Sequence, residues 1–396
     1  MGEMRIPRNF TSKWPMVRIG EYCEVVTGGT PSTKKSEYWE HGKIPWLTSE
    51  SLRDGDIKSP SKFITKSGLD NSSATMMPVN SVLIALTGAT TGRVGHLRLD
   101  SSANQSVTGI IAGKNVDARY LFYWLKSIRW IILEQMWGGG QPHISQGYVK
   151  SILFPLAPYE EQERIAAILD KTNDVRNLAT KSQNIRNRFL SSVFLDIFGD
   201  STIEETFPRT TIDEISVTVS KGTTPMTHGM DFVNEGIPFL RVQDLVNNPI
   251  VPSFASKAID ESTHDFLSRS QLKINDILIS IAGTIGRISI VPKDSPEMNC
   301  NQAVAFIRLS ETSVLRHCYL MYWLNSRDAR LQMAGSSVTA TISNLSLGKI
   351  KQLKIPVPPL DLQLRFEKIW ERFDLDSAHH GQLNQLVGSI TQEILT

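Results

Sequence analysis

Two kinds of turn in this 396-residue chain carry groups that could bind phosphate. The first is a Gly-Thr-Pro turn, which reads TGGTPS from Thr27 and KGTTPM from Lys221. The second is a glycine-rich turn that ends near an arginine, which reads GATTGRVG from Gly88 and GTIGRIS from Gly283. Backbone N–H groups, hydroxyls and a guanidinium suit the phosphate oxygens of a nucleic acid. The candidate contacts are Thr30, Ser32, Thr90, Thr91 and Arg93 in the earlier turns, and Lys221, Thr223, Thr224, Thr284 and Arg287 in the later ones. For the two arginines, an internal salt bridge that holds the turn is an equally open role.

Candidates for reading bases follow a shared strand pattern, IPWLTSESL from Ile44 and IPFLRVQDL from Ile237. After the common start the two segments diverge, with Thr48, Ser49 and Glu50 in one against Arg241, Val242 and Gln243 in the other. Arginine pairs with O6 and N7 of guanine, and glutamine pairs with N6 and N7 of adenine. We therefore hypothesise that Arg241 and Gln243 contact bases, with Thr48 and Ser49 in the equivalent place. Ordinary surface divergence accounts for each residue alone equally well.

Two further segments, WGGGQPHIS from Trp137 and AGSSVTATIS from Ala334, are polar and occupy equivalent positions. They are candidates for loops that enter a DNA groove, through His143 in the first and Ser337 and Thr339 in the second. Long surface turns without a role in binding are the alternative.

Nothing in the sequence predicts a catalytic residue, a bound cofactor or a metal site. GATTGRVG lacks the Gly-Lys-Ser/Thr ending of a phosphate-binding loop, and the eight histidines form no metal-binding spacing. The only Pro-Pro, in PVPPLD from Pro356, follows neither Asn nor Asp and is better explained as a helix start.

The bulk composition predicts a cytoplasmic protein with no membrane segment. The three cysteines lie far apart, which disfavours a disulfide framework, and no apolar run approaches the length of a membrane span. The formal net charge is only +2. Without a strong basic field, we expect the isolated chain to bind DNA weakly.

The turns belong to a duplicated module. Six further pairs of segments occur in the same order in both halves, from Trp14-Pro15 and Phe207-Pro208 to FPLAPYEEQERI and IPVPPLDLQLRF. Among them is an Asn-Gln motif, NQSV from Asn104 and NQAV from Asn301. The offset drifts only from 193 residues (Trp14 to Phe207) to 201 (Phe154 to Ile355), as expected of one copied domain with small loop changes. Short apolar runs between turn residues predict strands, and the aromatic runs from Tyr120 and Tyr319 predict helices, so each module is α+β.

Each module is followed by a long helical pattern. The first, from Tyr159 to Phe198, places apolar or small residues three or four apart, at Ile165, Ile168, Thr172, Val175, Ala179, Ser182, Ile185, Phe189 and Val193. The second starts near Leu360, with a similar series through Phe366, Ile369 and Phe373. Such stripes are typical of a coiled coil, so we expect the helices to pair. Antiparallel pairing would relate the two modules by a pseudo-twofold axis. A helix that lies on its own globular domain is the alternative.

Together, the ordered motifs, their duplication and the FLDIFGD helix end resemble the specificity subunits of type I restriction-modification systems, over nearly the whole chain. The resemblance implies two target recognition domains that each read half of a split DNA sequence. It also implies two methyltransferase subunits that hold the helices, and optionally a motor-nuclease subunit. One departure is that Ser51 to Asn80 matches Val246 to Asn275 poorly, which leaves the reading loops without matching templates.

The expected organisation is therefore an N-terminal segment (1–13), target recognition domain 1 (14–158), a central helix (159–198), a linker with target recognition domain 2 (199–358) and a C-terminal helix (359–396). Two other functions stay open from the sequence. One is a diverged DNA methyltransferase or nuclease with its own active site, and the other is a non-DNA scaffold that binds two copies of one protein.

Overall fold

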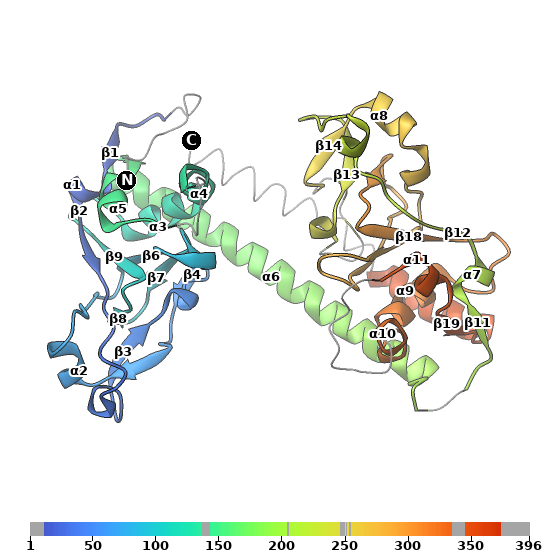
Figure 1. Cartoon of the computed structure of the whole chain (residues 1–396), viewed down its shortest axis with the longest axis horizontal. Helices are drawn as coiled ribbons and strands as arrows, with labels where there is room; N and C mark the ends of the chain where they lie inside the picture. Colours follow the sequence, from blue (N-terminus) through green and yellow to red (C-terminus); the bar gives the residue numbers. More distant parts are fainter. Residues whose placement is uncertain are drawn as a thin grey trace. The chain divides into compact units, whose positions relative to one another are not determined.

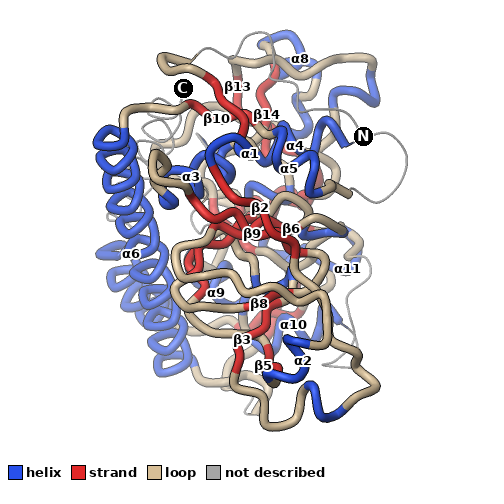
Figure 2. Tube along the Cα trace, turned by 90° about the vertical axis from the view of Figure 1, so that its left-hand side faces the viewer, coloured by secondary structure: helices blue, strands red, loops and turns tan. Residues whose placement is uncertain are grey.

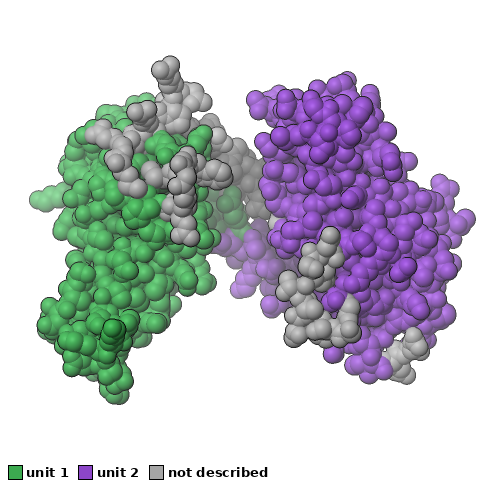
Figure 3. Space-filling model, viewed as in Figure 1, with its two compact units in different colours: residues 1–176, 386–396 green, residues 177–385 purple. Residues whose placement is uncertain are grey.

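The computed structural model describes residues 12–136, 143–203, 206–245, 250, 252, 255–334 and 345–373. The chain forms two compact units, which are coloured separately in Figure 3. Unit 1 comprises residues 1–176 and 386–396, and unit 2 comprises residues 177–385. None of the helices built from the described residues has the length and apolarity needed to cross a membrane.

The core of unit 1 is a five-stranded sheet whose strands are ordered β2-β9-β6-β7-β4 (Figure 1). Neighbours are antiparallel except for β4 and β7, which run parallel. The apolar segments predicted as strands are central, and every residue of β6 is buried. Helix α3 packs against β6 and β7 and is buried from Tyr120 to Leu125. These elements are β2 (Cys23–Thr27), β9 (Val107–Ala112), β6 (Val82–Ala85), β7 (Val94–Leu97), β4 (Gly55–Ile57) and α3 (Ala118–Ser127).

A second sheet of unit 1 consists of three short strands, in the order β5-β3-β8. The central strand β3 (Ile44–Leu47) runs antiparallel to β5 (Lys62–Ile64) and parallel to β8 (Ser102–Ala103). The carboxyl ends of β3 and β8 therefore lie side by side. A two-stranded ribbon of β1 (Met16–Arg18) and β10 (Leu153–Pro155) joins the start of the module to its end.

Unit 2 repeats this plan, which confirms the predicted duplication of an α+β module. Its four-stranded sheet has the order β12-β18-β15-β16, its three-stranded sheet has the order β14-β13-β17, and β11 pairs with β19. Strand β13 is antiparallel to β14 and parallel to β17, as β3 is to β5 and β8. The elements are β12 (Ser216–Lys221), β18 (Val304–Leu309), β15 (Ile277–Ser280), β16 (Ile288–Ile290), β14 (Lys257–Ile259), β13 (Ile237–Leu240), β17 (Asn299–Cys300), β11 (Arg209–Thr211), β19 (Lys354–Pro356) and α9 (His317–Asn325), which contacts β15 and β16.

Short helices complete both units at equivalent places. Helix α2 follows β5 and α8 follows β14, and each is capped by the preceding side chain, Thr65 or Asp260, which accepts a backbone N–H. The pairs α1 with α5 and α7 with α11 pack beside the two ribbons. Their bounds are α2 (Lys66–Asp70), α8 (Glu261–Phe266), α1 (Ile19–Tyr22), α5 (Gln146–Ser151), α7 (Ile212–Ile215) and α11 (Leu347–Lys351).

The region predicted to be helical from Tyr120 forms two helices, α3 and α4 (Arg129–Met136), and its counterpart from Tyr319 lies in α9 and α10 (Arg327–Ala334). A serine stands at or next to each break. The Ser127 hydroxyl donates to the Trp124 carbonyl, and Ser326 has extended backbone and accepts from the Ala329 N–H. Serine favours such local hydrogen bonds over helix continuation, which periodicity alone does not reveal.

Helix α6 (Tyr159–Phe198) is one uninterrupted helix with the predicted bounds (Figure 2). It follows Pro158 and carries Glu160 and Glu161 in its first turn, where negative charge is favourable. It ends at Gly199, whose φ of 75° suits glycine and whose N–H donates to the Leu195 carbonyl.

The buried face of α6 differs from the predicted stripe. Its first turns enter the core of unit 1 through Ile165, Ala166 and Leu169, and its last turns enter the core of unit 2 through Leu190, Phe194 and Phe198. In contrast, Val175 and Ile185 of the stripe are 38% and 58% exposed. At its ends the helix packs on globular domains, as in the alternative stated above, and Ile165 of the predicted stripe is among the residues buried there.

Residues 360–373 form the described start of the second long helix. Phe366 contacts Phe194 and Phe198, with ring centroids 5.4 and 5.8 Å apart, while Phe373 contacts Phe189 at 5.3 Å. Residue numbers rise along one helix as they fall along the other, so this part packs antiparallel to α6. The rest of the predicted coiled coil, 374–396, lies outside the described residues.

Candidate nucleic-acid interface

The predicted turns of unit 1 meet at the carboxyl ends of β3 and β8. The Gly29 N–H donates to the Ala103 carbonyl at 2.8 Å, and the Asn104 N–H donates to the Leu47 carbonyl at 2.9 Å. The Thr30 hydroxyl donates to Oε1 of Gln105. We call residues 28–32, 48–51 and 104–105 loop cluster 1.

Unit 2 builds loop cluster 2, residues 222–226, 241–244 and 301–302, with the same contacts. The Thr223 N–H donates to the Cys300 carbonyl at 3.1 Å, and the Asn301 N–H donates to the Leu240 carbonyl at 3.0 Å. The Thr224 hydroxyl donates to Oε1 of Gln302. The repeated Gly-Thr-Pro and Asn-Gln motifs are therefore two halves of one structure in each unit.

Glycine is required where the two halves touch. A Cβ at Gly28 would lie 2.4 Å from the carbonyl oxygen of Ala103, and a Cβ at Gly222 would lie 1.8 Å from that of Cys300. Both distances are far below van der Waals contact, and the obstacle is backbone rather than a flexible side chain. Any larger residue would push the Gly-Thr-Pro turn away from the Asn-Gln turn.

Gln105 and Gln302 are exposed at the surface of the two clusters. In each, the threonine hydroxyl occupies the amide oxygen, so the amide nitrogen keeps its two N–H donors for an outside acceptor. A phosphate oxygen or the edge of a base is such an acceptor. These glutamines were not among the predicted candidates, because their contact to threonine is made across some 75 residues and no local spacing reveals it.

The segment that diverges between the copies forms a 3₁₀ turn in both, η2 (Ser49–Ser51) and η5 (Val242–Asp244). The N–H of Thr48 donates to the Ser51 hydroxyl at 3.4 Å, and that of Arg241 donates to the Asp244 carboxylate at 2.7 Å. Backbone shape is thus shared while the side chains differ. Thr48 and Ser49 are half-buried, and Gln243 is exposed.

The guanidinium of Arg241 is already engaged within its cluster. Its Nε and Nη2 donate to the Ser256 hydroxyl at 2.9 and 2.8 Å, and that hydroxyl donates to Asp244 at 3.0 Å. This arrangement directs the arginine along the edge of the turn. Its Nη1 remains available to a further acceptor. To bind both O6 and N7 of a guanine, the arginine would also have to release Ser256.

The glycine-rich turns depend on left-handed glycines, Gly88 and Gly92 in unit 1 and Gly283 and Gly286 in unit 2, with φ from 71° to 83°. Among the described residues, neither arginine of these turns forms the internal salt bridge stated above as the alternative role. Arg287 donates through Nη1 to the Val242 carbonyl at 3.1 Å, which ties its turn to loop cluster 2. Arg93 is half-buried, and within the described part of the chain its buried Nε has no hydrogen-bond partner.

The remaining candidates fall into three groups. Thr91 is buried and its hydroxyl donates to the Gly88 carbonyl, and the half-buried Thr90 donates to Thr87, so both hold their turn. The exposed candidates are Ser32, Lys221, Thr284 and His143, while Thr223 is half-buried. The backbone of His143 forms an isolated antiparallel β-bridge with that of Thr87. Ser337 and Thr339 lie outside the described residues.

The segment that seemed unmatched between the copies does have a counterpart. Ser61 to Ile64 reads SKFI and contains β5, and Ser256 to Ile259 reads SKAI and contains β14. The hydroxyl of Ser61 forms a hydrogen bond with the hydroxyl of Ser51, and the hydroxyl of Ser256 likewise forms one with the carboxylate of Asp244. Intervening loops of different length hid this match, which is only four residues long. The predicted lack of a template in this region is wrong for β5, β14 and the helices that follow them.

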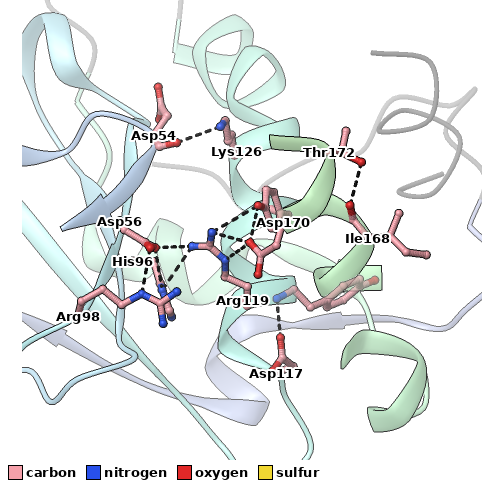
Figure 4. A network of polar contacts seen from close by, with 12 residues as sticks. Asp54, Asp56, His96, Arg98, Asp117, Arg119, Lys126, Ile168, Asp170 and Thr172 are labelled. Carbon is pink, nitrogen blue, oxygen red and sulfur yellow. Dashed lines mark hydrogen bonds and ion pairs between the residues drawn. The ribbon is translucent and has the colours of Figure 1, made fainter. Parts of the chain in front are cut away.

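Away from the clusters, unit 1 contains a dense polar network (Figure 4). Arg119 of α3 donates to Asp170 of α6 and to Asp56 of β4, both at 2.6 Å, and Tyr123 donates to Asp170 at 2.7 Å. Burial raises the pKa of Asp56, but the hydrogen bond from Arg98 and the charges of both arginines outweigh it, so the pKa lies below its usual value. Because its charges pair with one another, the network is an anchor between sheet and helix rather than an acid–base site.

A second anchor is repeated in both units. Gln162 is fully buried at the start of α6, accepts the Asp117 N–H at 2.9 Å and donates to the carbonyls of Asn115 and Ala157. Gln363 does the same with Arg316, Val314 and Pro358. The glutamine of each P-x-x-x-Q segment thereby fixes a long helix to the domain before it.

Within the described part of the chain, no group of three or more His, Cys, Asp or Glu side chains is placed to hold a metal ion. Cys23, Cys300 and Cys318 are buried free thiols, and burial raises the pKa of each. These thiols are packing residues and not nucleophiles.

Comparison with known proteins agrees with this architecture. The chain is 25% identical to the type I restriction enzyme MjaIX specificity subunit of Methanocaldococcus jannaschii, over 92% of this chain and 87% of the relative. It is also 25% identical to the MjaVIII specificity subunit of the same organism, over 100% and 94%. The fold is similar to the crystal structure of the type I restriction-modification S subunit from M. genitalium, with a TM-score of 0.51, 16% identity and coverage of 100% and 99%.

The sequence pattern of the type I restriction modification DNA specificity domain matches the chain twice, over residues 11–187 and 205–387. These two matches span most of the chain and coincide with the duplicated module. The relatives are specificity subunits of type I restriction enzymes. The chain therefore belongs to the specificity subunits of type I restriction-modification systems.

Proposed function

We propose that each unit reads one half of a bipartite DNA target through its loop cluster. The observation that carries this proposal is that one surface structure is built twice, with the same hydrogen bonds but different side chains at one turn. Thr30–Gln105 and Thr224–Gln302 are equivalent, whereas Thr48 and Arg241 differ.

This division of labour follows from the chemistry of DNA. Phosphates are alike in every sequence, so residues shared by both units suit the backbone, and differing residues suit the base edges that distinguish half-sites. The shared Gly-Thr-Pro and Asn-Gln turns would then position each unit. Thr48 and Ser49 in unit 1, with Arg241 and Gln243 in unit 2, would read bases, and bases between the half-sites would go unread.

The helices would separate the two reading units and hold the catalytic partners. Two methyltransferase subunits would dock on α6 and the C-terminal helix, and a motor-nuclease subunit would join in restriction. Exposed apolar side chains in the middle of α6 support this role, among them Leu178 at 66% and Ile185 at 58%. The buried reduced thiols are compatible with work in the cytoplasm.

The experiment is to express the chain with its methyltransferase subunit in a host that lacks both, and to map the methylated adenines. We expect one split motif with a fixed spacer. Substituting the turn at 241–244 should change one half of that motif and leave the other intact. A continuous motif, or changes in both halves, would contradict the proposal. Methyl transfer by the purified chain alone would instead assign it an active site of its own.

A further inference from the structure

A lysine stacked on an aromatic ring recurs in both units, beside the loop clusters. In unit 1, Nζ of Lys62 lies 5.9 Å from the ring centroid of Trp39. In unit 2, Nζ of Lys257 lies 5.6 Å from the ring centroid of Phe232. Both distances are in the range of cation–π attraction.

The aromatic ring beneath each lysine is itself held by a second ring. Trp39 packs edge-on against Trp46, at 5.1 Å and 88°, and Phe232 packs against Phe239 at 5.3 Å and 61°. In both units the second ring comes seven residues after the first and stands directly across the strand pair from the lysine, because Trp46 pairs with Lys62 and Phe239 pairs with Lys257. Two chance stacks would not share this register.

Each lysine also adjoins its loop cluster through the preceding serine. Ser61 hydrogen-bonds Ser51 of the turn η2, and Ser256 hydrogen-bonds Asp244 of η5. The strands that carry the lysines, β5 and β14, are edge strands of their sheets. Both lysines are exposed, and among the described residues neither ammonium has a carboxylate within ion-pair distance. An ammonium that is held in place, exposed and not neutralised is suited to an external anion.

We propose that Lys62 and Lys257 are equivalent phosphate contacts that set the register of each unit on the duplex, and that Trp39 and Phe232 hold them in position. This inference rests on the proposed function. The side chain of lysine normally loses much rotamer freedom when it binds, and a stacked stem has already lost part of it. Because the feature is common to both units while the adjoining turns differ, it suits the sequence-independent backbone.

The test is the salt dependence of DNA binding by the full chain, measured by fluorescence anisotropy. Duplexes with the mapped target and with an unrelated sequence are compared, between about 50 and 200 mM salt. Each phosphate contact adds about 0.9 to the steepness of log K against log salt. We expect Lys62→Gln and Lys257→Gln each to reduce it by about 0.9, and the double variant by about 1.8, on both duplexes.

A matched control is Lys13→Gln, which also removes a lysine stacked on tryptophan, with Nζ 5.4 Å from the Trp14 centroid, but beside the ribbon strand β1 and away from loop cluster 1. It should leave the slope unchanged. Trp39→Leu keeps the charge of Lys62 and removes its support, so it should weaken binding while the slope stays nearly that of the wild type.

Three results would overturn the inference. The first is an unchanged slope in the double variant while the wild-type chain binds DNA, which would leave the proposed function standing. The second is an equal loss in Lys13→Gln, which would show a general effect of net charge. The third is a wild-type chain that binds no duplex, alone or with its methyltransferase, which would refute the proposed function as well.

Discussion

Replacing Gln162 by methionine should detach the start of α6 from unit 1. The amide of Gln162 is fully buried and makes three hydrogen bonds to backbone groups. Methionine has similar length and helix propensity but neither donates nor accepts strongly. The variant therefore removes the polar contacts and keeps the packing.

The expected loss of stability depends on which backbone groups lose their hydrogen-bond partner. Asn115 is exposed, so its carbonyl can bind water instead. The Ala157 carbonyl and the Asp117 N–H are in buried or half-buried surroundings and lose their partner outright. An unsatisfied buried group costs about 1–3 kcal/mol, and the half-buried Asp117 N–H falls at the lower end of that range, so we expect a loss of about 2–4 kcal/mol in the free energy of unfolding of unit 1.

Calorimetry and urea denaturation measure the effect. A loss of this size lowers the Tm of a domain this large by roughly 4–16 °C. Gln363→Met should lower the transition of unit 2 in the same way, since Gln363 is equally buried. Glu163→Met, on the exposed side of the same turn, should change stability by no more than about 0.5 kcal/mol. If Gln162→Met stays within that margin, the buried amide is not an anchor and the reasoning is refuted.

Three other changes follow from the structure. Gly222→Ala places a Cβ 1.8 Å from the Cys300 carbonyl oxygen, so it should displace the turn and weaken DNA binding at least tenfold, by about 1.4 kcal/mol. Gly199→Ala, at the helix end, should leave DNA binding unchanged. Equal binding by both variants would argue against a role of loop cluster 2 in DNA binding. Arg241→Ala should weaken the binding free energy for DNA by about 1–3 kcal/mol and relax specificity in one half-site only, which binding to duplexes with single base-pair substitutions measures. A uniform loss of affinity on all sequences would make Arg241 a phosphate contact. Burial and the charges of Arg98 and Arg119 lower the pKa of His96 in the folded state, so the unfolded state binds more protons and stability should fall as the pH drops below about 6.5. Urea denaturation at two pH values should show a smaller drop for His96→Gln, and an unchanged drop would exclude His96 as the cause.

The two units secure their long helices by different ion pairs around the same glutamine. In unit 1, Arg119 bridges Asp56 and Asp170, with its side chain mostly buried. In unit 2, Arg316 makes two 2.8 Å hydrogen bonds to Glu367. Duplication thus preserved the fully buried polar contact and let the outer ones diverge. A buried unsatisfied amide is costly wherever it occurs, whereas water can hydrate a partly exposed charge that has lost its partner.

Much of this protein is determined by sequence alone. The duplication, the α+β character of each module and the bounds of α6 all come from local signals: turn residues, short apolar runs, and proline and glycine at the ends of a helix. The Gly-Thr-Pro and Asn-Gln motifs were visible for the same reason. Such signals need only neighbours in the chain, so they can be recognised without a fold.

Only the tertiary structure decided which of these residues meet. The parallel pairing of β3 with β8 brings Thr30 to Gln105, and the antiparallel pairing of β3 with β5 sets Lys62 opposite Trp46. The face of α6 that is buried was likewise chosen by the domain cores at its two ends rather than by the period of its own sequence. Strand pairing and domain packing join residues distant along the chain, and no local spacing encodes which partners they find.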